Sequence, residues 1–303
     1  MKVGPLTLKL IFWFIKKQDL KRRVTWPSPE RYDPIYDVDA LGDGNFFHQF
    51  DVFRAPKEIR NGCTLIDSHG GAYIYGDRKN NFGYASVFLN KGYDVVLLDY
   101  EHNGKGRDCR DQVRALGAEL RYLRDHVSEL GLQDPNQWLL TGDSAGGHFA
   151  LLLAEASCDC AFSAQLGLDL QGISFLGVAL SCPVYDFVRA TASPSMSRGG
   201  LRATFGEAVE SDEYRRLLCP RIHIGSLKIP LFLNTCRNDF LLQESLDLKN
   251  DMDVLAKEIS YVYVDKEDKA IQHVHNVTEI QLVDSMAVNG AMASFFAECR
   301  NAN

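Results

Sequence analysis

The chain has 303 residues, which is enough for one large α/β domain with a substantial core, so no second full domain is required. Hydrophobic residues make up 46% of the chain and charged residues 24%, proportions that are ordinary for a soluble globular protein. The net charge is −7 and no basic stripe offsets it, which argues against binding to nucleic acid.

The first feature along the chain is an apolar run at Leu6–Ile15, interrupted by Lys9 and followed by basic residues. The run is too short to span a bilayer, and its charges lie on the wrong side for a signal peptide. We therefore expect an amphipathic helix within an N-terminal cap region, residues 1–30, that packs on its own protein. The alternative is that its Trp and Phe side chains, with basic neighbours, rest on a membrane surface or a lipid-like substrate.

Beyond two prolines at positions 27 and 29, apolar runs alternate with segments of helical spacing. The expected elements are an edge strand at Phe46–Phe53, a strand at Cys63–Asp67, a helix around Tyr84–Leu89, a strand at Tyr93–Tyr100, a helix within Asp108–Leu130, a strand and a helix within Trp138–Ala156, strands at Ile173–Leu180, Ile229–Thr235 and Ser260–Val264, and a final helix at Thr278–Cys299. This alternation predicts an α/β fold, with a mostly parallel twisted sheet and helices on both faces, in a single domain over 1–303.

One stretch, residues 186–226, does not fit the alternation. It follows a strand, contains a Ser- and Gly-rich segment, and holds a short charged helix near Ser211–Leu218. We interpret it as a small lid-like insertion rather than a separate domain.

The strongest motif is Gly142-Asp143-Ser144-Ala145-Gly146, which lies between the apolar run from Trp138 and the helical segment that ends near Ala156. Because glycine has no Cβ, a strand and a helix can close on each other around Ser144 and force its backbone into a strained conformation. The hydroxyl is then exposed at a helix N-terminus, as in the nucleophile elbow of serine hydrolases.

A serine hydroxyl needs a base that takes its proton and an acid that orients the base. The acid candidate is Asp239, which follows the strand that ends at Thr235. The base candidates are His273 and His275, between the last strand and the final helix, and spacing alone leaves both open. The order Ser, Asp, His is one of the known orders of catalytic triads.

Attack on a carbonyl creates an oxyanion, which preorganised N–H donors must stabilise. His69-Gly70-Gly71 follows its strand directly, so the N–H groups of Gly70 and Gly71 are candidates for an oxyanion hole. The N–H of Ala145, the residue after the serine, is the third candidate.

Other polar residues are expected to have structural roles. Asp67 and Asp99 end strands and are expected to fix loops, and Asp143 is expected to hold the elbow or the oxyanion loop. His148, on the helix after Ser144, is expected to be packed or hydrogen-bonded rather than catalytic.

The eight cysteines are scattered, and none of their spacings is typical of zinc or redox motifs. We therefore expect free thiols and a cytoplasmic location. No metal-ligand cluster, phosphate-binding loop or dinucleotide-binding motif is found in the sequence, so we expect neither a metal nor a cofactor.

Taken together, four motifs resemble those of the α/β-hydrolase fold and, within it, the hormone-sensitive-lipase-like esterases. These motifs are His69-Gly70-Gly71-Ala72-Tyr73, Gly142-Asp143-Ser144-Ala145-Gly146-Gly147, Asp239-Phe240-Leu241 and His273-Val274. The resemblance begins at about Phe46 and implies that Ser144, Asp239 and His273 form the triad, with His275 as the alternative base. It further implies an oxyanion hole at the His-Gly-Gly glycines, a cap with N-terminal residues over the active-site mouth, and hydrolysis of short-chain carboxylic esters.

Two other functions are compatible with the same residues. One is hydrolysis of an amide, as in a formamidase or a peptidase, and the other is binding of a small molecule without turnover. The expected partner is a small-molecule ester, without nucleic acid and without a stable membrane span, and a homodimer is compatible with the sequence.

Overall fold

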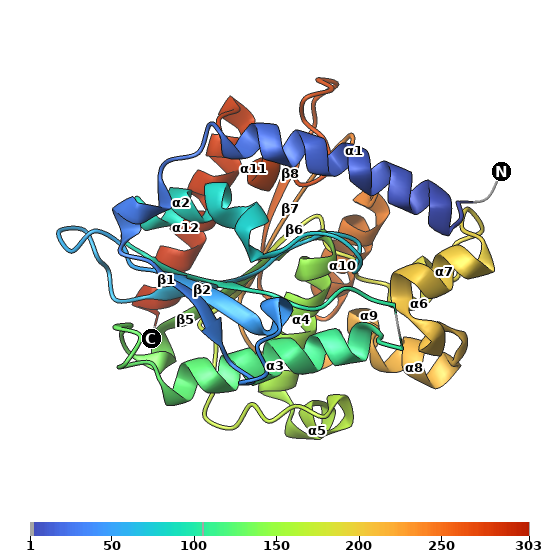
Figure 1. The fold of residues 1–303 in the computed structure, drawn as a ribbon, viewed down its shortest axis with the longest axis horizontal. Coiled ribbons are helices and arrows are strands. Elements are labelled where there is room, and N and C mark those ends of the chain that lie inside the picture. Colours follow the sequence, from blue (N-terminus) through green and yellow to red (C-terminus); the bar gives the residue numbers. More distant parts are fainter. Residues whose placement is uncertain (1–2, 105, 303) are drawn as a thin grey trace.

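The computed structural model describes residues 3–104 and 106–302, and in this part of the chain an eight-stranded sheet forms the centre of the molecule (Figure 1). The strand order is β1-β2-β4-β3-β5-β6-β7-β8. The strands are β1 (Ile35–Asp39), β2 (Gln49–Phe53), β3 (Thr64–Ser68), β4 (Asp94–Leu98), β5 (Trp138–Asp143), β6 (Val178–Ser181), β7 (Leu231–Cys236) and β8 (Ile259–Val264). β2 pairs antiparallel with β1 and β4, and the remaining pairs are parallel. This arrangement, with helices on both faces, confirms the predicted α/β-hydrolase fold.

The helices cover both faces of the sheet (Figure 1). They are α1 (Pro5–Arg23), α2 (Phe82–Leu89), α3 (Cys109–Asp125), α4 (Ser144–Cys158), α5 (Cys160–Leu166), α6 (Phe187–Thr191), α7 (Arg198–Phe205), α8 (Asp212–Leu217), α9 (Pro220–His223), α10 (Leu242–Val254), α11 (His275–Thr278) and α12 (Val283–Asn301). Consecutive strand residues such as Leu65 and Ile66 belong to separate hydrophobic cores, because successive side chains of a strand point to opposite faces. One core contains side chains of α3, α4 and α10, and the other contains side chains of α2 and α12.

The sheet differs from the sequence prediction at its margins. β2 is not the edge strand, because β1 pairs with its outer side. Residues 173–177 precede β6 rather than belonging to it, and the final helix, α12, begins at Val283 rather than at Thr278, where the short α11 ends. The helices α5 and α10 were not predicted.

The lid-like insertion, residues 186–226, contains α6 to α9 and no strand, and it lies between β6 and β7. Its side chains reach the main body, as where the Tyr214 hydroxyl accepts the N–H of Cys109 at 2.9 Å. α1 runs along the margin of the molecule and contacts α7 of the insertion (Figure 1). No helix in the described part of the chain combines the length and hydropathy that crossing a bilayer requires.

Two glycines allow α4 to approach the ends of β3 and β5. A Cβ on Gly146 would lie 1.9 Å from the carbonyl oxygen of Ser68, and a Cβ on Gly142 would lie 2.5 Å from that of Gly146. Both distances are far below van der Waals contact, and both neighbours are backbone atoms that no side-chain rotation can displace. The Gly-x-Ser-x-Gly spacing is therefore a packing requirement of this fold.

We expect Gly146→Ala to lower the free energy of unfolding by about 3 kcal/mol or more, because the new methyl group forces α4 away from the sheet. Urea denaturation monitored by circular dichroism measures the change. The control is Gly290→Ala in α12, where a Cβ meets no atom within 4 Å. This control is expected to gain about 0.5–1 kcal/mol from the better helix former, and equal stabilities of wild type and Gly146→Ala would contradict the packing argument.

Candidate active site

Ser144 lies at the turn between β5 and α4, with a φ of +53°. Residues other than glycine rarely adopt this backbone conformation, so the strained backbone expected at the elbow is present. The surrounding contacts of Gly142 and Gly146 enforce it. Ser144 is partly exposed, and its hydroxyl is therefore accessible to a small molecule at the start of α4.

The structure brings Ser144, His273 and Asp239 together from three separate segments. His273 Nε2 lies 2.9 Å from Ser144 Oγ, and His273 Nδ1 lies 2.6 Å from Asp239 Oδ1. The loops that carry Asp239 and His273 are joined because Asn238 Nδ2 donates to the carbonyl oxygen of Ile271 at 2.8 Å. This arrangement has the connectivity of a nucleophile, a base and an orienting acid.

Asp239 is held in its ionised form. Burial raises the pKa of this carboxyl, but hydrogen bonding to His273 and the positive charge of that residue when protonated lower it more, and the N–H of Leu241 adds to this effect. The pKa of Asp239 therefore lies below its usual value. Its second oxygen accepts the Thr235 hydroxyl at 2.8 Å, which fixes the carboxylate plane.

His275 points elsewhere. It is fully buried, and its Nδ1 lies 2.9 Å from the Ser285 hydroxyl of α12. Burial lowers the pKa of His275, so its neutral form is favoured. Of the two histidines that the sequence left open, only His273 contacts Ser144.

The loop after β3 carries two of the predicted oxyanion donors, the N–H groups of Gly70 and Gly71. They differ in whether another residue already accepts their hydrogen bond. The N–H of Gly70 already donates to Asp143 Oδ1 at 2.9 Å. The N–H groups of Gly71 and Ala72 have no acceptor among residues 3–104 and 106–302. Ala72 has a φ of +49°, so this loop is strained as well. Ala145, in the first turn of α4, lies at the position where helical N–H groups have no intrahelical partner.

A buried polar cluster supports this loop from behind. Asn81 Nδ2 donates to Asp143 Oδ1 at 2.8 Å and to Asp67 Oδ2 at 2.9 Å. Burial, together with the nearby charge of Asp143, raises the pKa of Asp67 to about 8. The expected loop-fixing roles of Asp67 and Asp143 agree with these contacts.

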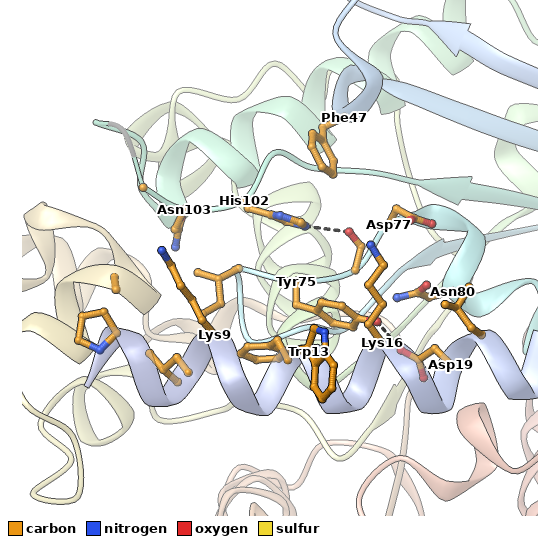
Figure 2. Close-up of a pocket in the computed structure, with 18 of the residues that line it drawn as sticks. Lys9, Trp13, Lys16, Asp19, Phe47, Tyr75, Asp77, Asn80, His102 and Asn103 are labelled. Carbon is orange, nitrogen blue, oxygen red and sulfur yellow. Dashed lines mark hydrogen bonds between the residues drawn. The ribbon is translucent and has the colours of Figure 1, made fainter. Parts of the chain in front are cut away.

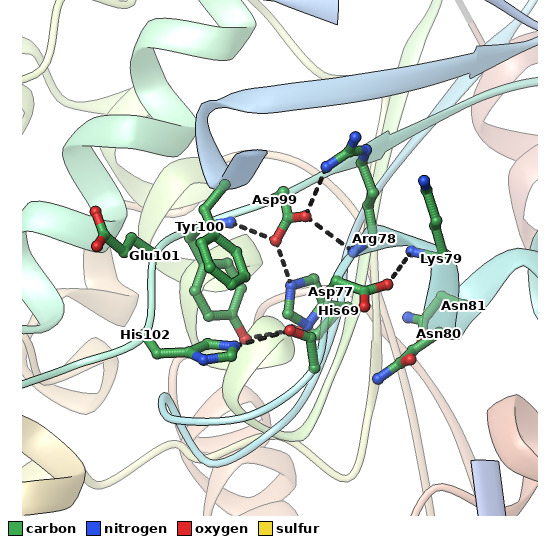
Figure 3. A network of polar contacts seen from close by, with 12 residues as sticks. His69, Asp77, Arg78, Lys79, Asn80, Asn81, Asp99, Tyr100, Glu101 and His102 are labelled. Carbon is green, nitrogen blue, oxygen red and sulfur yellow. Dashed lines mark hydrogen bonds and ion pairs between the residues drawn. The ribbon is translucent and has the colours of Figure 1, made fainter. Parts of the chain in front are cut away.

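His69 links the loop to a second buried cluster, shown in Figure 3. Its Nδ1 lies 2.6 Å from the carbonyl oxygen of Gly70, and its Nε2 lies 3.1 Å from Asp99 Oδ1. Asp99 also accepts from Arg78 Nη1 at 3.0 Å. Both ring nitrogens of His69 therefore face acceptors, which requires the doubly protonated ring. Burial is the largest influence and lowers the pKa of His69, but the hydrogen bond and charge of Asp99, the Gly70 carbonyl and the charge of Asp143 together outweigh burial and raise it.

His148, one turn after Ser144, joins the lid-like insertion to the same loop. Its Nε2 donates to the carbonyl oxygen of Leu218 at 2.7 Å, and its Nδ1 lies 3.1 Å from the Tyr73 hydroxyl. Burial lowers the pKa of His148 to about 4. This neutral histidine is hydrogen-bonded on both sides and does not contact the serine, as expected from the sequence.

Cys182 lies beside the triad. Its sulfur, a ring nitrogen of His273 and a carboxylate oxygen of Asp239 all lie within 4.8 Å of one another. Burial raises the pKa of this thiol well above its usual value, so the thiol stays protonated and is a poor metal ligand. Its sulfur accepts the N–H of Val274 at 3.4 Å. These residues fit a hydrogen-bonded triad better than a metal site. Cys182 is a free thiol, as are Cys63, Cys109, Cys158, Cys160, Cys219 and Cys236.

A pocket of about 760 Å³ lies between α1 and the outer side of the loop that follows Ala72. Figure 2 shows Lys9 and Lys16 of α1 on one wall and His102 on the opposite wall. The residues that line it do not include Ser144 or its two partners. The pocket is therefore separate from the triad, although the same loop borders both.

α1 contacts the loop that follows β3 and the segment just after α11. The rings of Phe12 and Tyr75 stack with centroids 5.2 Å apart, and the Tyr75 hydroxyl donates to Asp19 at 2.7 Å. Arg22 donates to Glu279, just after α11, at 2.8 Å. These contacts fit the expected cap region, which stays a prediction.

Several supporting residues were missed by the sequence analysis. Asn81 and Arg78 carry no local motif, because their partners are distant in sequence. Ala72 lies within the His69-Gly70-Gly71-Ala72-Tyr73 motif, but the motif alone does not show that its N–H is free. The sequence signal that pointed to this region was the placement of Asp67 and Asp99 at strand ends.

Comparisons with known proteins agree with this geometry. The family model of BD-FAE matches residues 50–252, more than half of the chain. The chain is 28% identical over 172 residues to the probable carboxylic ester hydrolase LipM of Mycobacterium tuberculosis, and 27% identical over 170 residues to esterase LipQ of the same organism. Each match covers 54% of this chain and 39% of the relative, so the chain spans about two fifths of their length.

Solved structures show the same fold. Esterase B from Lactobacillus rhamnosis, in a form described as C6-C4 SN3 inhibited, has a TM-score of 0.88 at 24% identity, over 98% of this chain and 96% of that one. The same esterase, described as inhibited with a C4-C4 SN3 tributyrin phosphonate, has a TM-score of 0.86 at 24% identity, over 98% and 95% of the two chains. A bacterial heroin esterase has a TM-score of 0.71 at 16% identity, over 98% and 93%.

The raised pKa of Asp67 predicts how stability depends on pH. An unfolded aspartate has a pKa of about 3.9, whereas the folded value is about 8, so folding takes up a proton between these values. The stabilisation is complete below the lower pKa and is lost as the pH rises through the upper one. We expect Asp67→Asn to make the slope of unfolding free energy against pH less negative by about 1.4 kcal/mol per pH unit between about pH 5 and 7. Urea titrations at several pH values test this, and identical slopes in the two proteins would contradict it.

Proposed function

This chain belongs to the BD-FAE family, and we propose that it is a serine hydrolase that cleaves carboxylic esters with Ser144, His273 and Asp239. The observation that carries the proposal is the unbroken path of short contacts from Ser144 Oγ through His273 to Asp239, at 2.9 and 2.6 Å. The names of its curated relatives, which are ester hydrolases, support the same class of reaction.

In the proposed mechanism, His273 Nε2 takes the proton of the Ser144 hydroxyl as the oxygen attacks the ester carbonyl. Asp239 accepts from Nδ1, fixes the tautomer of the ring and stabilises the imidazolium that forms. The tetrahedral intermediate then expels the alcohol, which takes the proton from His273. Water attacks the acyl-enzyme by the same route, with His273 again as base, and releases the acid.

We propose the N–H groups of Gly71, Ala72 and Ala145 as the donors to the developing oxyanion. Gly71 and Ala145 were expected in this role, and the free N–H of Ala72 adds to them. The N–H of Gly70 is already engaged by Asp143, so we assign Gly70 to holding the loop. Each lost donor typically costs about 3 kcal/mol of transition-state stabilisation.

The acyl group is proposed to be short. Esterase B, which has the same fold, is described in a C6-C4 SN3 inhibited form and in a form inhibited with a C4-C4 SN3 tributyrin phosphonate. Because the likeness at 24% identity concerns the fold, these chain lengths determine only which substrates are tested first.

The test is hydrolysis of p-nitrophenyl esters of increasing acyl length, from acetate through butyrate to longer chains. We expect turnover of the short esters, and a loss of kcat of about 10⁴- to 10⁶-fold in Ser144→Ala and His273→Ala. The matched control is His275→Ala, measured where it is folded, which retains most of the activity because His275 does not contact Ser144.

Other outcomes would point elsewhere. Faster turnover of a p-nitroanilide than of the matching ester would favour the amide hydrolase. An enzyme that is inert on every ester, and whose Ser144 is not labelled by a reactive phosphonate, would favour a binding protein without turnover. Loss of activity in His275→Ala alone would overturn the assignment of His273.

A further inference from the structure

Several large apolar side chains of α1 are exposed on the side away from the main body, and two of them, Trp13 and Leu20, also border the pocket beside α1. Its largest exposed apolar residues are between 50% and 81% exposed, and they are Leu6, Leu10, Trp13, Phe14 and Leu20. At 3.6 residues per turn, these five positions fall on one side of the helix. The opposite side carries Phe12 and Asp19, which contact Tyr75 of the main body. None of the residues of α1 is buried.

The charge of α1 is opposite to that of the rest of the chain. The helix holds six of the 33 Lys and Arg residues and only one of the 40 Asp and Glu residues. That single acid, Asp19, is already bonded to Arg22 and to the Tyr75 hydroxyl. On the outward side, Lys17 and Lys21 are exposed, and the ammonium group of Lys17 lies 3.6 Å from the ring centre of Trp13.

We propose that this outward side of α1, the docking face, binds the surface of an anionic lipid bilayer. The docking face consists of Leu6, Leu10, Trp13, Phe14, Lys17 and Lys21. Leucine and aromatic side chains of an interfacial helix enter the boundary between headgroups and acyl chains, and lysines beside them pair with anionic headgroups. The helix lies in the plane of the interface, which agrees with its lack of the features of a membrane span.

The charges favour a lipid surface over a second copy of this chain. A twofold symmetric dimer through the docking face would bring Lys17 and Lys21 of both copies into one interface. Such a contact would bury like charges with no acid of α1 to pair them, since Asp19 lies on the inward side. An anionic bilayer offers an apolar region for the leucine and aromatic side chains of the docking face and negative headgroups for its lysines.

Docking in this orientation would bring the lipid close to the candidate site, because α1 contacts Tyr75 of one site loop and Glu279 beside the other. This consequence for substrate access rests on the proposed function. The binding itself does not, and it is measured without any substrate.

The experiment is co-sedimentation of the full chain with vesicles of phosphatidylcholine and phosphatidylserine, against vesicles of phosphatidylcholine alone. We expect binding to the anionic vesicles that weakens with added salt, accompanied by a blue shift of tryptophan fluorescence. The shift is assigned to Trp13 through its loss in Trp13→Phe, since the other tryptophans are Trp26 and the buried Trp138. Lys17→Gln with Lys21→Gln is expected to weaken binding about 30-fold, from about a five-fold contribution of each basic side chain near an anionic surface.

The matched control is Lys91→Gln with Lys228→Gln, which removes the same charge from two exposed lysines outside α1 and is expected to leave binding unchanged. Equal losses in both pairs would overturn the proposal in favour of a nonspecific charge effect. Absence of binding to the anionic vesicles would also overturn it. So would a dimer in vesicle-free solution that Trp13→Ala dissociates, because the face would then be a protein interface.

Discussion

The close approach of three backbone segments, at the ends of β3 and β5 and the start of α4, is the constraint on which the rest of the site depends. It is possible only because Gly142 and Gly146 have no side chain at the points of contact. Once α4 sits there, the turn at Ser144 has no room to relax, and its positive φ follows. The same contact places the backbone of Ser68 and His69 against α4, so the loop that begins at Gly70 emerges beside the serine.

That loop is held by buried charges more than by its own hydrogen bonds. Asp143 at the end of β5 accepts the N–H of Gly70, and Asp99, just after β4 on the other side of β3, holds His69. Arg78 stabilises Asp99 and is itself completely buried. A buried charge that loses its partner is costly, so these pairs give the strained loop a single well-defined conformation. The N–H groups of Gly71 and Ala72, which we propose as oxyanion donors, are thus preorganised by buried side chains behind the loop.

Much of this architecture could be predicted from local pattern alone. The apolar strands, the elbow and the order of Ser144, Asp239 and His273 are encoded in short segments, each of which has a physical signature. β1 was not predicted, because apolar and polar residues alternate poorly in Ile35–Asp39, which holds two aspartates among five residues. Its register against β2 is also irregular. The choice between His273 and His275 required the fold, since both lie in one short loop and only backbone direction separates them. The occupied N–H of Gly70 depends on Asp143, a partner 73 residues away, which no spacing rule reveals.

The site is assembled from two halves with different connections to the core. Ser144 and the proposed oxyanion loop follow the central strands β5 and β3. Asp239 and His273 follow β7 and β8, near the edge of the sheet. Asn238 joins the two edge loops to each other. α1 contacts both halves through Tyr75 and Glu279, and it does so with partly exposed polar and aromatic contacts and no buried residue. A segment with so little buried surface has a low free energy of local opening compared with α4 or the strands. α1 therefore costs less to displace than α4 or the strands, and its displacement would reach both halves of the candidate site.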